Sequence, residues 1–331
     1  MSDKSGGSTK QNMSKSAPVE SKGPRKIKAL PSRPVNNIRD NTFWYSDGNI
    51  VIQAGVKLFK LHASRLQRFC VYFKEMVDLD GGDAKRIEAC PVHNVPQGAT
   101  AEGFKAVLYV VEVPFETFTS KLTLPGIIAM LEAAHLLSCN SALHVAKRRL
   151  ATVWDPHPVP ARPDPENVIP YTSTIATIHR AGDYNLFSIE KRAFYELLSS
   201  ENYWQAYFHT NRESIDLSAY DRERLLHARD VLGRWWREFV LTPPEATQRG
   251  NPATGRTKCK WCTYKVTTER ERVWRLFIIG KGDLEHGALD PLRYNLVDLR
   301  RQDLLNEWWC MDCLRNKENA WKAKTVEWWG Y

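Results

Sequence analysis

Two proline-rich stretches interrupt this chain and decide how it can be divided into folded parts. Proline fixes φ and lacks a backbone N–H donor, so neither stretch can continue a helix or a central strand. The first, DPHPVPARPDPENVIP, spans residues 155–170, and the second, TPPEATQRGNPATGRT, spans residues 242–257. The chain is therefore predicted to have ordered segments at 43–155, 171–241 and 258–331, with a proline-rich linker at 156–170.

The first 41 residues have the composition of a disordered tail. They consist mainly of Ser, Lys, Gly and Pro, so they cannot bury enough apolar surface to offset the entropy of ordering. Residues 1–40 hold nine Lys or Arg against three Asp or Glu, which places +6 of the formal net charge of +9 in this tail. The rest of the chain is nearly neutral, so its charge does not by itself indicate a nucleic-acid-binding body.

We expect an intracellular protein, in the cytoplasm, the nucleus or both, that is neither secreted nor membrane-bound. The sequence lacks the apolar segment of a signal peptide, and no uncharged apolar run reaches the roughly 18 residues that cross a bilayer. Seven cysteines in 331 residues are too few for a disulfide framework.

Hydrophobic patterning in residues 43–155 predicts an α+β fold. Two β-rich runs at 49–53 and 57–61 are joined by three residues that include Gly55, which indicates a hairpin. Apolar residues then recur every three or four positions across 64–77, the spacing of a helix with one buried face. A short β-rich run at 87–92 precedes three further helical patterns, near 104–111, from 124, and over 141–154. Strands followed by helices are typical of α+β domains rather than doubly wound sheets.

The same region resembles a known family. The likeness is carried by four runs: WYSDGNIVI (44–52), LFKLHASRL (58–66), YFKEM (72–76) and EACPV (88–92). In this order they resemble the opening hairpin, first helix and Cys-Pro strand of a BTB/POZ domain, above all of the type found in mushroom-forming (basidiomycete) fungi. The resemblance covers residues 43–155, and a mostly α-helical extension over 171–241 is similar to the helices that come after the domain in that group.

The resemblance implies a protein–protein interaction adaptor or scaffold. In BTB domains the first strand and helix build homodimers, which places dimer contacts here around Phe43, Trp44, Tyr45 and Phe69. The opposite face recruits partners that include the cullin scaffold of ubiquitin ligases, and the matching contact here is Glu102. This chain has Thr100-Ala101 before Glu102, where the family has a large apolar residue, and residues 31–41 are poor in helix formers, which argues against a strand-swapped dimer.

Two Cys-x-x-Cys pairs in the last segment predict a structural zinc site. Both thiolates of such a pair can reach one tetrahedral Zn²⁺, and two pairs complete its four ligands. The ligands would be Cys259, Cys262, Cys310 and Cys313, and His286 is a conceivable substitute. The pairs stand 48 positions apart, beyond the usual ~15–20, so buried reduced thiols or a redox pair are the alternatives.

Tryptophan is the other unusual feature of the last segments. Ten of the twelve tryptophans come after residue 200. We expect them to fill a core, because each buries ~150–250 Å² and the region has few Ile and Val. Exposed tryptophans beside arginines would instead suit stacking on single-stranded nucleic acid, and Trp328-Trp329 is the pair expected to dock elsewhere. This keeps open a second interpretation, a nuclear nucleic-acid-binding transcriptional regulator that uses the basic tail and the four-cysteine segment.

Signatures of enzymes are absent from the sequence, so we do not expect catalysis. There is no Gly-x-x-x-x-Gly-Lys-Ser/Thr loop and no His-Glu-x-x-His, and Gly280-Lys281-Gly282 lacks the third glycine of a dinucleotide loop. His62 invites a catalytic interpretation, but we expect a satisfied structural histidine.

Overall fold

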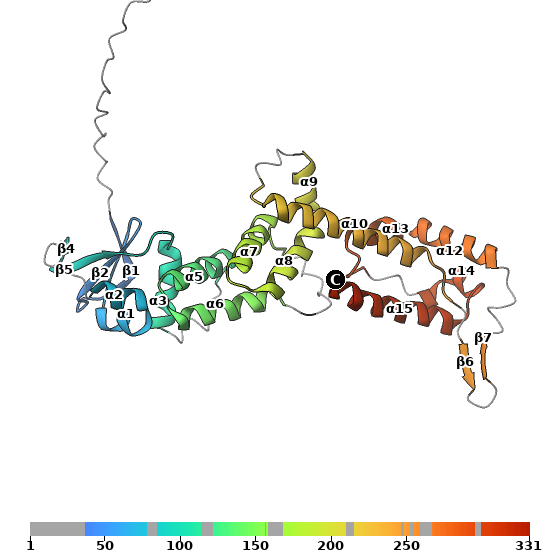
Figure 1. The fold of residues 1–331 in the computed structure, drawn as a ribbon, viewed down its shortest axis with the longest axis horizontal. Coiled ribbons are helices and arrows are strands. Elements are labelled where there is room, and N and C mark those ends of the chain that lie inside the picture. Colours follow the sequence, from blue (N-terminus) through green and yellow to red (C-terminus); the bar gives the residue numbers. More distant parts are fainter. Residues whose placement is uncertain are drawn as a thin grey trace, which may run out of the picture. The chain divides into compact units, whose positions relative to one another are not determined.

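The computed structural model describes most of the chain from residue 37 onward. The described residues are 37–77, 85–113, 122–155, 157, 168–209, 215–245, 248–251, 255–258, 267–294 and 299–331. Most of the predicted tail and linker lie outside them. Ile38–Tyr331 form one compact unit, which is mixed α+β and mostly helical, so the expected fold class is confirmed at this level (Figure 1).

A small mixed sheet opens the unit, in the strand order β1-β3-β2-β5-β4. The predicted hairpin is formed by β2 (Ile50–Ala54) and β3 (Lys57–Leu61), with Gly55 at a φ of +56° in the turn. β5 (Cys90–Asn94) pairs parallel with β2, and the two-residue β4 (Arg86–Ile87) pairs antiparallel with β5. β1 (Ile38–Trp44), which the sequence did not predict, pairs parallel with β3 at the sheet's edge.

The two faces of the sheet differ in what covers them. Because side chains alternate along a strand, Ile50 and Ile52 point to the main core while Val51 points to the other face. That second face holds a small apolar cluster of its own, formed by Val51, Leu58, Cys90, Trp44, Ile87 and Val92.

Helices cover the core face of the sheet. The predicted helix 64–77 is two helices, α1 (Ala63–Phe69) and α2 (Val71–Val77), because Cys70 adopts an extended backbone. α3 (Ala101–Glu112) and α5 (Leu124–Leu136) begin with threonine caps, and α6 (Asn140–Val153) is the next helix along the chain. At Gly103 α3 approaches α5 so closely that a Cβ would lie 2.3 Å from the Ala129 carbonyl oxygen.

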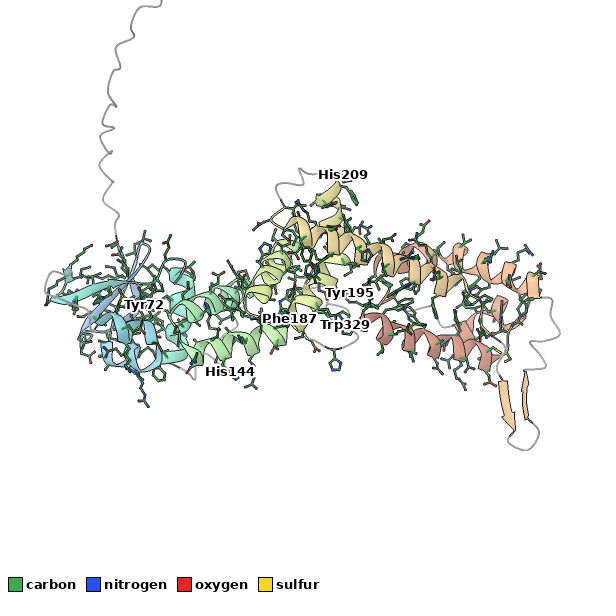
Figure 2. All side chains as sticks on the ribbon, viewed as in Figure 1. Tyr72, His144, Phe187, Tyr195, His209 and Trp329 are labelled. Atoms are coloured by element: carbon green, nitrogen blue, oxygen red, sulfur yellow. The ribbon has the colours of Figure 1, made fainter. Side chains whose placement is uncertain are left out.

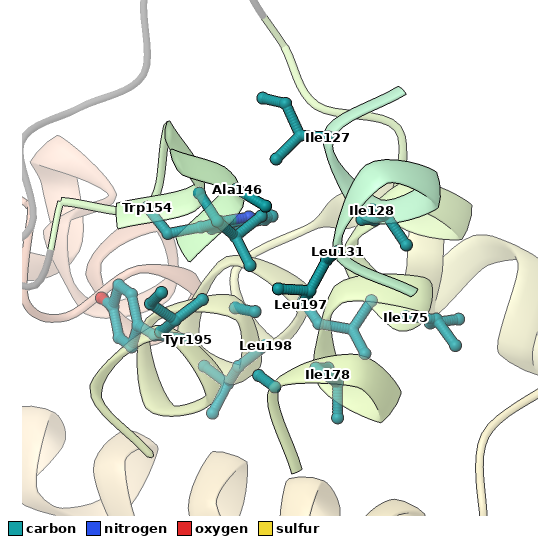
Figure 3. Close-up of a cluster of buried hydrophobic side chains, with 14 of the residues drawn as sticks. Ile127, Ile128, Leu131, Ala146, Trp154, Ile175, Ile178, Tyr195, Leu197 and Leu198 are labelled. Carbon is teal, nitrogen blue, oxygen red and sulfur yellow. The ribbon is translucent and has the colours of Figure 1, made fainter. Parts of the chain in front are cut away.

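The core continues from the first segment into the next four helices. These are α7 (Tyr171–Asp183), α8 (Phe187–Leu198), α9 (Glu201–His209) and α10 (Ala219–Leu241). Figure 3 shows Leu131 and Trp154 of the first segment packed with Ile178 and Leu197 of α7 and α8, and all four are buried. The residues on either side of the proline-rich stretch thus share one hydrophobic core.

The last segment packs along α10. Its elements are α12 (Thr267–Lys281), α13 (Asp283–Leu289), η3 (Leu299–Arg301), α14 (Asp303–Asn306) and α15 (Met311–Gly330). Before it, β6 (Gln248–Asn251) and β7 (Gly255–Lys258) form an antiparallel pair that lies almost entirely within the second proline-rich stretch. Trp236 of α10 is fully buried, donates to the carbonyl of Asp283, and lies edge-on to Trp321 at 4.8 Å. Within the described residues, no helix is both long and apolar enough to traverse a bilayer.

Six of the tryptophans after residue 200 are buried, which confirms the expectation of a tryptophan-filled core. They are Trp204, Trp236, Trp274, Trp309, Trp321 and Trp328. Of the pair expected to dock elsewhere, Trp328 is buried and Trp329 is half-buried. Trp261 lies outside the described residues.

Candidate functional site

The expected zinc centre needs correction. Cys310 and Cys313 lie together at the start of α15, with their Sγ atoms 3.4 Å apart, while Cys259 and Cys262 lie outside the described residues. In the part of the chain that the structure describes, no group of three or more His, Cys, Asp or Glu side chains could hold a metal ion. A structural zinc site needs four converging ligands, so the zinc prediction is wrong on this finding. His286, the conceivable substitute, is exposed on α13.

The residues expected at a dimer interface fall into different environments. Phe43 is fully buried and meets the Tyr109 ring edge-on at 5.0 Å, so it is a core residue rather than a contact residue. Trp44 is half-buried on the opposite face of the sheet, where the Arg39 guanidinium covers its ring at 4.6 Å. Tyr45 and Phe69 are half-buried against the main core, near the two ends of α1. Three of the four expected residues therefore keep some accessible surface.

His62 is held by its neighbours, as expected of a structural histidine. Its ring stacks on Tyr45 with the centroids 5.4 Å apart, and its Nε2 lies 3.2 Å from the Asp47 carboxylate. Hydrogen bonding to His62 holds the pKa of Asp47 below its ordinary value. These contacts fix the entry to α1.

Glu102 is exposed in the first turn of α3 and pairs with Lys57 at 3.1 Å. A carboxylate at this place is stabilised by the positive end of the helix dipole. The helix dipole therefore explains why a carboxylate is favourable at this position. The Glu102 side chain remains accessible to a partner.

Buried charges fasten β1 to the rest of the sheet. Asp40 accepts hydrogen bonds from the amides of Thr42 and Phe43 and pairs with Lys105 of α3 at 2.9 Å. Burial alone would raise the pKa of Asp40, but these donors and the Lys105 charge bring it below the ordinary value. The carboxylate is therefore ionised and holds the edge strand against α3.

Exposed apolar residues gather where β1 meets β3. Ile38 is 59% exposed, and its amide donates to the carbonyl of Val56, which is itself 46% exposed. Because β1 is an edge strand, this end of the sheet combines apolar side chains with backbone groups that a second chain could use. Neither residue stood out in the sequence, since β1 has no clear alternating pattern.

Sequence reasoning also missed a pocket of about 430 Å³ lined by α8, α10 and the end of α15. Its aromatic lining includes Phe187 and Phe194 of α8 and Trp328 and Trp329 of α15. The sequence singled out Trp328-Trp329, but no local pattern indicated which earlier helices would face them.

Comparison with known proteins leaves the family open: neither a family model nor a curated protein matches this chain.

Proposed function

We propose that this protein is an interaction adaptor or scaffold in which residues 43–155 form a BTB-type domain. The supporting observation is the position in the fold of the four sequence runs that carry the resemblance. They lie in the β2–β3 hairpin, in α1 and α2, and in β5, which pairs parallel with β2 (Val51 opposite Val92). The hairpin and helices α1, α2, α3, α5 and α6 share one core, while Cys90 and Val92 of β5 pack in the small cluster on the other face of the sheet.

The accessible surface around β1 supports self-association as the mode of interaction. Ile38 and Val56 expose apolar side chains at the β1 edge, and Tyr45 and Phe69 are partly accessible along α1. Burying such side chains between two copies yields about 25 cal/mol per Å² of apolar area. We therefore infer a homodimer that uses this region, without Phe43.

The oligomeric state tests this proposal. Light scattering on the full chain over a range of concentrations should give the mass of a dimer. Ile38→Glu and Phe69→Glu should each shift it to the mass of a monomer, because a charge is then buried in the contact. Leu276→Glu is the matched control, since Leu276 is 56% exposed on α12 and should leave the dimer intact. A wild-type chain that stays monomeric at every concentration would refute the homodimer.

The cullin scaffold is the partner that the resemblance implies, and Glu102 is the residue to test. Co-purification with a cullin should be lost in Glu102→Ala and kept in Lys57→Ala, which removes only the intramolecular partner of Glu102. A wild-type pull-down without cullin would exclude this partner while leaving the adaptor proposal open to other proteins.

A nucleic-acid-binding regulator receives less support. The tryptophans that would stack on bases are largely engaged in the core, with Trp236, Trp274 and Trp309 at most 1% exposed. Binding to single-stranded nucleic acid that survives removal of residues 1–37 and weakens steeply with salt would favour this function instead.

A further inference from the structure

The pocket between α8, α10 and the end of α15 plays no part in the proposed adaptor role. Its volume of about 430 Å³ falls within the ~300–1,000 Å³ of small-molecule sites. Phe187 and Tyr331 are 68% and 63% exposed, whereas Tyr195 and Trp328 are buried, so the aromatic lining runs from the surface into the core. Figure 2 shows Phe187, Tyr195 and Trp329 close to one another where α8 meets α15, and the rings of Tyr195 and Trp329 meet edge-on at 5.8 Å.

The charged lining of this pocket is unbalanced. Glu190, the one acidic side chain among the described lining residues, lies 3.4 Å from Arg224, which also stands over the Phe194 ring at 4.7 Å. Lys191 places its Nζ 5.3 Å from the centre of the Trp329 ring, and among the described residues no acidic side chain pairs with it. Burial lowers the pKa of Lys191 from its ordinary value. The pocket thus has at its rim an exposed ammonium group for which the described residues provide no acidic partner.

We propose that this pocket binds a small aromatic organic anion, with its ring system between the aromatic walls and its acidic group on Lys191. Aromatic walls favour a flat ring through offset or edge-to-face contacts. An anionic group would pair with Lys191, for which the described residues provide no acidic partner, whereas a cation would be repelled by Lys191; Arg224 is already paired with Glu190 and Asp221. The inference rests on the pocket alone and is independent of the adaptor proposal.

Two fluorescent probes of closely similar shape test the requirement for a negative charge. Anilinonaphthalene sulfonate carries an aromatic body and a sulfonate, and phenylnaphthylamine has the same rings without the charge. In titrations of the full chain, the sulfonate should bind at one saturable site and at least about tenfold more tightly than the neutral probe, as expected for one charge-assisted hydrogen bond. Energy transfer from tryptophan to the probe provides the readout.

Variants locate the site. Lys191→Gln should weaken sulfonate binding about tenfold and leave the neutral probe unchanged, while Lys191→Arg should keep wild-type affinity. Arg234→Gln removes an exposed positive charge of α10 that does not line the pocket and should have no effect. Ala228→Trp fills the pocket from α10 and should remove saturable binding of both probes.

The proposal is overturned if the two probes bind equally well, if Lys191→Gln binds the sulfonate as the wild type does, or if Ala228→Trp retains saturable binding while its circular dichroism matches the wild type. Should Ala228→Trp fail to fold, the comparison of Lys191→Gln with Lys191→Arg still decides. Light scattering on each variant reports the oligomeric state independently of probe binding. A loss of probe binding at unchanged mass therefore concerns the pocket and not the dimer.

Discussion

The hydroxyl of Tyr195 donates a 2.5 Å hydrogen bond to the Asp290 carboxylate, although the two residues belong to different predicted segments. The same hydroxyl accepts a bond from the backbone N–H of Leu292 at 3.0 Å. Arg293 completes this network by pairing with Glu196, the neighbour of Tyr195 on α8. Burial and the Asp290 charge raise the pKa of Tyr195 well above its ordinary value, so it stays a neutral donor. This network ties the middle helices to the last segment.

Tyr195→Phe should destabilise the chain by about 1–3 kcal/mol, because it leaves the buried Leu292 N–H without its acceptor and removes one hydrogen bond from the Asp290 carboxylate, which keeps its pairing with Arg293. Urea unfolding monitored by circular dichroism measures the loss. Tyr220→Phe is the matched control, since Tyr220 is 70% exposed on α10. Equal stability of Tyr195→Phe and the wild type would show that the network contributes nothing to the fold.

Arg65→Ala should cost about 3 kcal/mol, because it leaves a buried carboxylate without its cation. Arg65 of α1 pairs at 2.8 Å with Glu112 of α3, whose side chain is 0% exposed. Arg68→Ala, at an exposed position of the same helix, should cost far less. Adding Glu112→Gln to Arg65→Ala should restore part of the stability, since the stranded charge is then removed. No recovery in the double variant would contradict this account.

Gly287→Ala should be strongly destabilising, by about 1–3 kcal/mol or more, as overpacking of a core is. A Cβ at Gly287 would lie 2.0 Å from the ring of Trp236, which is fully buried and cannot move aside. Gly280→Ala makes the same change in α12 with no atom within 4 Å, and should be neutral or stabilising by up to about 1 kcal/mol. Thermal unfolding of the two variants should therefore move in opposite directions.

Local patterns in the sequence predicted the local elements of the fold. The hairpin around Gly55 and the helices near 104–111, from 124 and over 141–154 are confirmed, because each depends on periodicity and turn residues close together in the chain. β1 could not be predicted, because it is held by parallel pairing with β3 and by the Asp40–Lys105 ion pair, both tertiary contacts. Likewise, Cys70 divides the predicted helix at a point where no proline or glycine marks a break.

Site residues were harder to predict than elements. The zinc prediction failed because the Cys-x-x-Cys spacing brings Cys310 and Cys313 together but does not determine which distant side chains join them, and among the described residues no group of three or more possible ligands forms. Phe43 is a core residue because its ring packs edge-on against Tyr109, and the buried positions of β1, Asp40 and Phe43, are three residues apart and so do not follow the alternation of a regular strand. The pocket beside Lys191 and Trp329 is assembled from three helices, so no single stretch of sequence carries its signature.

Lys317 is a buried base in the core of the last segment. Its Nζ donates to the Phe239 carbonyl at 2.7 Å and lies 3.7 Å from the centre of the Phe239 ring. Burial lowers the pKa of Lys317 from 10.5 to about 8. Below that pH the amine is protonated in both the folded and the unfolded chain, so the folded state bears the cost of a buried charge.

The stability of the wild type should therefore rise with pH between about 8 and 10.5, because in this window the unfolded chain still binds the proton that the folded chain has released. The gain is about 3 kcal/mol over the window. Lys317→Met should remove this rise, whereas Lys322→Met, at an exposed position of α15, should keep it. Urea unfolding of the wild type and of each variant is measured at intervals between about pH 8 and 10.5. The readout is the slope of the free energy of unfolding against pH. A slope unchanged in Lys317→Met would mean that Lys317 is not the group that titrates.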